Sequence, residues 1–128
     1  YTGMNYEERK RTTLAKRGQK VILPPLTDAD SLQAHIDDNV WTASVIVGSL
    51  GDGDSLKSII HGAGEWNEYR ILAVGNHLQH FINGALVWGV TDNDTVNRKL
   101  SGLIGVQVHV GPPMKVEYRN FRLRHITD

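Results

Sequence analysis

Side chains that exchange protons or hold anionic groups are concentrated in a few short stretches of this chain. Residues 6–11 read Tyr-Glu-Glu-Arg-Lys-Arg, and residues 105–114 read Gly-Val-Gln-Val-His-Val-Gly-Pro-Pro-Met. Histidine ordinarily titrates close to neutral pH, so His109 is a candidate general base. The carboxylate of Glu7 beside the guanidinium of Arg9 can position a polyhydroxyl or anionic ligand. These residue types indicate acid–base chemistry on a polar ligand.

The alternation of side chains from 102 to 110 predicts how His109 is presented. Apolar residues occupy the even positions from 104 to 110, which is the pattern of a strand with one buried face. Gln107 and His109 then lie on the opposite face, and Gly105 keeps that face shallow enough for a ligand to approach the backbone. We expect His109 to line a polar concave surface; an ordinary surface histidine is the alternative.

We also consider the case in which residues 6–11 form a strand. Glu7, Arg9 and Arg11 would then share one side, where carboxylate and guanidinium groups orient a ligand together. The alternative is a solvated edge strand whose charges prevent pairing with other chains.

Residues 77–90 predict a hairpin, because Asn83-Gly84 is the strongest two-residue turn signal. A tight turn there pairs His80 with Val87. It places His80 on one face and puts Gln79, Phe81 and Trp88 on the other. Which face is buried stays open: His80 is a core histidine or a reserve base. Likewise, the aromatic face is core or a platform on which a sugar ring stacks.

Composition limits the classes of function. The chain has 128 residues, of which 40% are hydrophobic, enough for one packed domain. Fourteen basic residues balance fourteen acidic ones, so we expect no nucleic-acid partner. The chain has no apolar run long enough to span a membrane. Cysteine is absent, which excludes disulfides and thiolate metal sites.

The remaining patterns predict an all-β sandwich with two short helices. The helices follow Asp28 and Asp52, each of which is a helix N-cap candidate before a short apolar run. The Asp-x-Asp spacing at both places lacks the glycine and distal glutamate of a calcium loop, so we predict no metal there. Strands are predicted at 1–6, 11–15, 20–23, 41–50, 67–74, 77–82, 85–90, 102–110 and 115–124.

Three motifs carry a resemblance to a known family: Gly-Glu-Trp-Asn-Glu-Tyr at 64–69, Gln-His-Phe-Ile-Asn-Gly at 79–84, and Gln-Val-His-Val-Gly-Pro-Pro-Met at 107–114. With them, the chain resembles the 3-keto-disaccharide hydrolase family over almost its whole length, least so at 25–62. The resemblance implies a concanavalin-like jelly roll. Family members carry further strands before the segment that resembles Tyr1. Residues 1–128 are therefore expected to be a single partial jelly-roll domain, completed by an upstream segment or another chain.

The resemblance also implies a substrate: a glycoside already oxidised to a ketone at C3 of the sugar. The ketone acidifies the C2 hydrogen, a base removes it, the C1 substituent leaves, and water adds to the product. His109 is our candidate base, with Glu7 and His80 as competitors, and Arg9 is the candidate enolate stabiliser. Lys10 stands where relatives tend to have glycine, which stiffens the loop around Arg9. The candidate substrate-binding residues are Gln107, Lys115, Gln79 and Trp88.

Other expectations follow from this hypothesis. No cofactor is predicted, since a divalent cation has no support in the sequence. The expected partner is a sugar or glycoside, and the expected location is periplasmic or secreted. The alternative function is a non-catalytic carbohydrate-binding jelly roll that uses Trp88, Phe81 and Gln79.

Overall fold

The computed structural model describes residues 2–25, 37 and 43–126, and its regular elements are mostly strands. Two strands, β1 (Asn5–Glu7) and β2 (Thr12–Ala15), form a small antiparallel sheet. The others form a five-stranded sheet in the order β4-β3-β7-β6-β5, in which β3 and β7 are parallel neighbours. Their bounds are β3 Gln19–Leu23, β4 Val45–Ser49, β5 Tyr69–Val74, β6 His77–Ile82 and β7 Ala85–Asp92.

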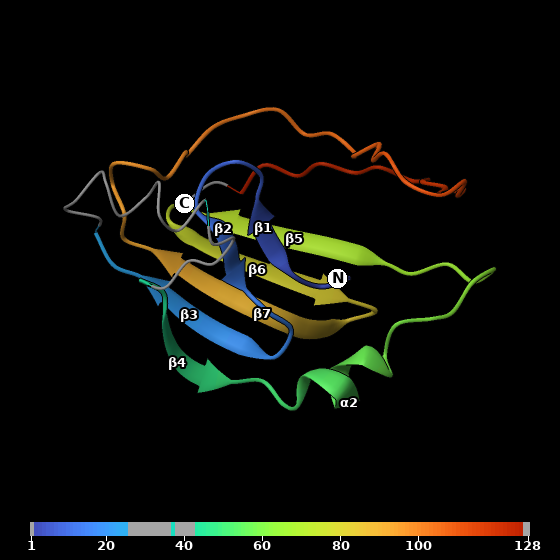
Figure 1. Ribbon diagram of the computed structural model, residues 1–128, viewed down its shortest axis with the longest axis horizontal. Helices are drawn as coiled ribbons and strands as arrows, with labels where there is room; N and C mark the ends of the chain where they lie inside the picture. The colour runs from blue at the N-terminus through green and yellow to red at the C-terminus, as the bar shows by residue number, and fades with distance from the viewer. Residues whose placement is uncertain (1, 26–36, 38–42, 127–128) are drawn as a thin grey trace.

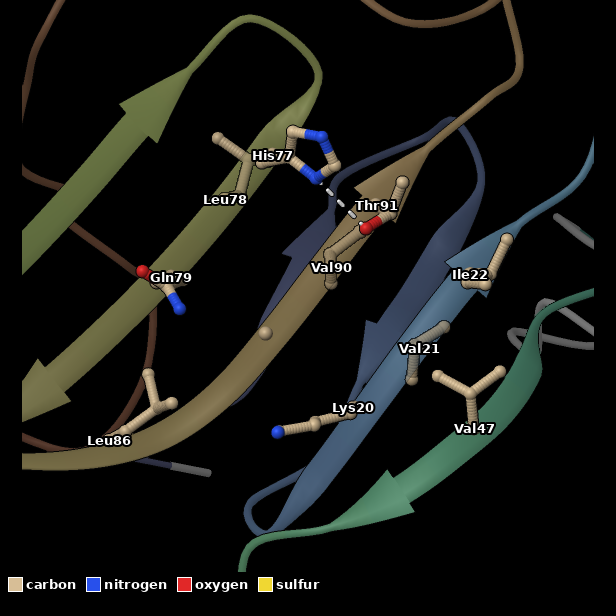
Figure 2. Close-up of a pocket in the computed structure, with 11 residues that line it drawn as sticks. Lys20, Val21, Ile22, Val47, His77, Leu78, Gln79, Leu86, Val90 and Thr91 are labelled. Atoms are coloured by element: carbon tan, nitrogen blue, oxygen red, sulfur yellow. Dashed lines mark hydrogen bonds between the residues drawn. The ribbon is translucent and has the colours of Figure 1, made fainter.

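The small sheet lies across one face of the large one, which we call the inner face (Figure 1). Leu14 and Ala15 of β2 join the buried cluster that contains Val21 and Leu23 of β3 and Val90 of β7. Burying one such aliphatic side chain stabilises the fold by about 1.5–3 kcal/mol. The opposite, outer face carries the alternate residues of the same strands and is not covered by β1 or β2 (Figure 2). The arrangement confirms the all-β sandwich.

The local turn predictions are confirmed where glycine or asparagine sets the backbone. Asn83 and Gly84 have φ of 49° and 83°, the left-handed values that a tight hairpin turn needs. Gly18 turns the chain between β2 and β3 with φ 87°. An added Cβ on Gly18 would collide with the backbone oxygen of Gly51, so only glycine fits there.

The register of the β6–β7 hairpin differs from the predicted one by a single step. Phe81 pairs with Leu86 as a tight turn requires, but an irregularity between His80 and Phe81 shifts the ladder beyond it. His80 consequently pairs with Trp88 and not with Val87. The prediction that Trp88 shares a face with Gln79 and Phe81 is therefore wrong, because one extra residue in a ladder exchanges the faces of those that follow.

Within residues 43–126 the one helix is α2 (Gly53–Lys57). Its N-cap is Asp52, as predicted, and the Asp52 carboxylate accepts a hydrogen bond from the backbone nitrogen of Ser55 at 3.3 Å. The helix predicted after Asp28 lies outside the described residues, as does the beginning of the strand predicted at 41–50.

The strands predicted at 1–6 and 11–15 correspond to β1 and β2, but no strand runs through 6–11, so Glu7, Arg9 and Arg11 do not share one side of a strand. The chain turns after β1 and returns as β2, so that Glu7 pairs with Thr12. Arg9 and Thr12 have left-handed φ values of 56° and 62°, whereas Lys10 does not, so its side chain is not strained by the turn. Within this turn the side chain of Arg11 folds back onto the carboxylate of Glu7.

The strands predicted at 102–110 and 115–124 are absent. Residues 101–126 are exposed throughout and run out and back as an extended trace that belongs to neither sheet (Figure 1, orange to red). A strand requires a neighbour that completes its hydrogen-bond ladder. None of the described strands pairs with these residues. Alternating side chains without such a neighbour leave the segment extended and its apolar residues open to solvent.

Candidate functional site

A buried arginine surrounded by carboxylates joins the two sheets. The Arg11 side chain donates to Glu7 from Nε at 2.9 Å and from Nη2 at 2.6 Å. It also donates to Asp92 of β7, with Nη1 at 2.9 Å from Oδ1 and Nη2 at 2.8 Å from Oδ2. Asp94 lies 3.6 Å from Nη1 and is fully buried. Arg11 itself is only 1% exposed, so this cluster is closed to a ligand.

The charge of Arg11 is maintained by its partners. Burial by itself lowers the pKa of Arg11, but the hydrogen bonds and charges of Glu7 and Asp92 together raise it above its ordinary value. The Asp94 carboxylate is satisfied by Asn97, whose Nδ2 donates to it at 2.7 Å. We interpret the cluster as structural, because each carboxylate is already occupied by donors of the protein.

His80 is held on the inner face between two aromatic rings. Its ring makes edge contacts with Tyr69 at 5.1 Å and with Trp88 at 5.5 Å between centroids. Burial lowers the pKa of His80, so its imidazole is neutral near pH 7. Neither Nε2 of His80 nor Nε1 of Trp88 has a hydrogen-bond partner among the described residues. Both side chains are enclosed, and a substrate has no access to them in this arrangement.

The side chain of Asn83, in the Asn-Gly motif, fixes the position of the turn between β6 and β7. Nδ2 of Asn83 donates to the backbone oxygen of Ile59 at 2.7 Å and to Oδ1 of Asn67 at 2.8 Å. Oδ1 of Asn83 accepts from the backbone nitrogen of Glu68 at 2.9 Å. Arg119 stacks over the Trp66 ring, with its guanidinium carbon 3.9 Å from the centroid. These contacts give Trp66, Asn67 and Asn83 a structural role.

A shallow pocket with a volume of about 380 Å³ lies on the outer face of the large sheet. It spans β3, β7 and β6, and its polar side chains lie on the face opposite β1 and β2 (Figure 2). Two cross-strand rows build it. In one row Lys20 pairs with Gly89, and Gly89 pairs with Gln79. In the next row Thr91 pairs with His77. Four polar side chains thus surround a glycine on an open sheet face, and we call this the outer-face pocket.

The polar groups of the outer-face pocket are held in different ways. Nδ1 of His77 lies 3.0 Å from the Thr91 hydroxyl (Figure 2). Lys20 is exposed, and its aliphatic stem packs over Gly48 of β4, where an added Cβ would be 3.3 Å from the Lys20 Cδ. Gly89 has open space above it, since a Cβ there would meet nothing within 4 Å. Leu86 and Val47 supply apolar walls.

The residues proposed from the sequence are not gathered in one place. His109, Gln107 and Lys115 lie in the exposed segment 101–126, where Lys115 pairs with Glu117 at 3.0 Å. Arg9 is exposed on the β1–β2 turn, and the Glu7 carboxylate is bound by Arg11. The concavity expected to unite His109, Glu7 and Arg9 is not formed by the described residues. The roles proposed for these residues stay predictions.

Two other proposed residues, His80 and Trp88, lie on the inner face, whereas Gln79 lines the outer-face pocket. Sequence reasoning missed Lys20, His77 and Thr91. His77 stands two residues before Gln79 in the strand predicted at 77–82, and this strand alternation was the available signal. Lys20 could not be assigned to this site from the sequence, because the parallel pairing of β3 with β7 connects segments far apart in the chain.

Within residues 2–25, 37 and 43–126, no group of three or more His, Asp or Glu side chains is arranged to hold a metal ion. In the same part of the chain, no helix has the length and apolar character needed to cross a bilayer.

Comparison with known proteins identifies a family. The family described as the 3-keto-alpha-glucoside-1,2-lyase-like domain matches residues 6–124. No curated protein and no solved structure matches the chain significantly.

Proposed function

Because this chain belongs to the 3-keto-alpha-glucoside-1,2-lyase-like domain family, we propose that it cleaves glycosides whose sugar carries a ketone at C3. The family match over residues 6–124 carries this proposal, and the all-β sandwich is compatible with the concanavalin-like fold of the family. The substrate class is a 3-keto-glycoside, and the reaction is elimination across C1 and C2 followed by hydration.

The chemistry follows from the acidity that a ketone gives to the neighbouring carbon. A base takes the C2 proton, and the electron pair of the C2–H bond forms an enolate with the C3 oxygen. The enolate then restores the C3 ketone, forms a C1=C2 double bond and expels the C1 oxygen, which takes up a proton. Addition of water across C1 and C2 gives the free 3-keto sugar. The net result is hydrolysis without redox change.

Such a reaction requires three kinds of group on one surface. It needs a base that is unprotonated near neutral pH, a cation or donor near the C3 oxygen, and polar side chains that hold hydroxyls. The outer-face pocket contains an imidazole, an ammonium, an amide and a hydroxyl around an open floor. This combination supports the outer-face pocket as the place where a sugar ring binds.

Release of the leaving group tests the function directly. The 128-residue chain would be incubated with p-nitrophenyl 3-keto-α-glucoside, and p-nitrophenolate would be followed by its absorbance. The matched control is the same glycoside with an unoxidised C3 hydroxyl, whose C2 hydrogen is not acidic. We expect release from the ketone alone, because a placed base accelerates proton abstraction by about 10²–10⁴-fold.

Two results would contradict the proposal. Equal cleavage of both glycosides would indicate an ordinary glycosidase, for which the ketone is irrelevant. Binding of the 3-keto-glycoside without cleavage would favour the non-catalytic carbohydrate-binding module.

A further inference from the structure

We infer that the outer-face pocket binds an acidic sugar residue of the glycoside, with Lys20 and Gln79 holding its carboxylate or sulfate group over Gly89. This inference rests on the proposed function and deepens it by stating the charge of the substrate. It concerns binding alone, and no step of the reaction is assigned to these side chains.

Lys20 and Gln79 stand in one cross-strand row of the large sheet. Lys20 of β3 pairs with Gly89 of β7, and Gly89 pairs in turn with Gln79 of β6. Two inter-strand spacings of about 4.8 Å each therefore separate the backbones of Lys20 and Gln79. A Cβ built on Gly89 would meet nothing within 4 Å, so the space above it is open. A sugar residue lying on Gly89 is thus flanked by both side chains.

The two side chains direct hydrogen-bond donors toward the same place. Figure 2 shows Nζ of Lys20 directed from β3 toward β7, and the amide nitrogen of Gln79 directed from β6 toward β7. Neither group donates to an acceptor among the described residues. An ammonium group has donors alone, and the amide nitrogen is also a donor, so the complementary ligand group is rich in acceptors. Carboxylate and sulfate oxygens are such acceptors, and they also balance the charge of Lys20.

Lys20 and Gly89 occupy strands in the interior of the sheet. Lysine commonly protects an edge strand from pairing with other chains, but β3 lies between β4 and β7. Gly89 lies on β7, the central strand of the five, where a glycine weakens the sheet and often marks the close approach of a ligand to the backbone. Both positions favour a binding role for this row over protection of an edge.

The strands of the large sheet present positive charge and no carboxylate on the outer face. In β3 to β7 the only acidic residue is Asp92, and its carboxylate is bound by Arg11 on the side of the small sheet. The Lys20 ammonium lines the outer-face pocket without an opposite charge from these strands. An uncompensated cation in a depression raises the local concentration of anions. A neutral sugar gains hydrogen bonds there, whereas an acidic sugar gains the charge interaction as well.

A second cation extends this surface beyond the outer-face pocket. Arg70 of β5 pairs with Phe81 of β6, and its guanidinium carbon lies 5.3 Å from the centroid of the Phe81 ring. Phe81 pairs with Leu86, a wall of the pocket, so Arg70 belongs to the same face as Lys20. The ring contact restrains the guanidinium, which remains exposed. We expect Arg70 to contact the next acidic residue of an oligosaccharide bound at Gly89.

The test measures binding separately from cleavage. Trigalacturonate would be titrated into the 128-residue chain at low ionic strength, and its Kd determined by calorimetry. The matched ligand is the methyl ester of trigalacturonate, which has the same sugar skeleton without the charges. A trisaccharide of galactose 6-sulfate distinguishes sulfate from carboxylate, and methyl α-galacturonide is a single acidic residue. A single-stranded oligonucleotide of equal charge tests for unspecific binding of polyanions.

The variants change one group of the surface at a time. Lys20→Met removes the ammonium, Gln79→Leu removes the amide, and Arg70→Gln removes the second cation. Gly89→Val fills the floor of the pocket. The space above Gly89 accommodates the added side chain, and β-branched residues favour strands, so this variant keeps the fold. The matched control is Lys57→Met, which removes an exposed cation of α2, outside the outer-face pocket.

We expect the wild-type protein to bind trigalacturonate or the sulfated trisaccharide more tightly than the methyl ester, with an affinity that falls as salt is added. Lys20→Met should weaken this binding by about 10-fold, and Gln79→Leu by about 3–10-fold. Gly89→Val should abolish it while the melting temperature is at least that of wild type. Arg70→Gln should weaken the trisaccharide but not methyl α-galacturonide. Lys57→Met should bind as the wild type does.

Several results would overturn the inference. Equal affinity for the charged trisaccharides and the methyl ester would do so, as would wild-type affinity in folded Lys20→Met or Gly89→Val. Equal affinity for the oligonucleotide would refute the assignment to a sugar. Release of p-nitrophenolate from the 3-keto-α-glucoside separates the inference from the proposed function. Cleavage without binding of either acidic trisaccharide overturns the inference alone, whereas binding of an acidic trisaccharide without any cleavage of the 3-keto-glycoside contradicts the proposed function alone.

Discussion

Replacing Arg11 by methionine is expected to destabilise the protein severely. Methionine has a similar length but no charge, so Asp92 and Asp94 would lose the cation that faces them. These carboxylates belong to residues that are 5% and 0% exposed, and water cannot take the place of the guanidinium without opening the fold. Removing one partner of a buried ion pair costs about 3–5 kcal/mol.

This loss is large compared with the whole stability of a domain, which is about 5–15 kcal/mol. For a chain of this length it corresponds to a decrease of about 10–20 °C in melting temperature. The cluster also joins β1 and the β1–β2 turn to β7, because Arg11 bonds Glu7 and Asp92 at once. We therefore expect the small sheet to detach from the large one first.

The assay is thermal and urea unfolding at pH 7, followed by circular dichroism. The double variant Arg11→Met/Asp92→Asn is the informative comparison. It removes the arginine together with the negative charge of Asp92, which would otherwise be left without a cation. It should be more stable than Arg11→Met alone if uncompensated charge is the cause. A loss below about 1 kcal/mol in Arg11→Met would refute the reasoning, since that is the value of an exposed pair.

Two further predictions concern His80 and Asn83. Burial lowers the pKa of His80, so below about pH 6.5 the unfolded chain binds a proton that the folded protein does not. Its contribution to stability is complete above that pH and is lost as the pH falls toward the lower folded pKa, by at most about 1.4 kcal/mol per pH unit. Urea midpoints at pH 7 and pH 5 should differ less in His80→Leu than in wild type; an equal difference would contradict this. Asn83→Ala removes three side-chain hydrogen bonds and places alanine at φ 49°, so we expect a loss of about 3 kcal/mol. Asn83→Gly should lose less, since glycine tolerates that φ, and equal melting temperatures for the two variants would argue against backbone strain.

The features that the sequence determined by itself are local ones. Asn83 and Gly84 specify a hairpin turn because their left-handed φ values cost them little. Asp52 specifies a helix start because its carboxylate reaches a backbone nitrogen three residues away. Alternating apolar residues indicated the all-β class, and the three motifs indicated the family that matches residues 6–124. The turn and the helix start depend on interactions between residues that are only a few positions apart in the chain.

Only the tertiary structure decided which face each side chain occupies and which distant groups meet. One irregularity between His80 and Phe81 moves Trp88 onto the inner face, and hydrophobic pattern alone does not reveal a bulge. Arg11 meets Asp92 across 81 positions of the chain, and this contact ties the β1–β2 turn to β7. The alternation at 102–110 predicts a strand, but a strand forms only where a neighbour completes its ladder. Lys20 and His77 line the same pocket because β3 pairs in parallel with β7, which in turn pairs with β6. Such pairings depend on the register of segments far apart in the chain, which no local pattern encodes.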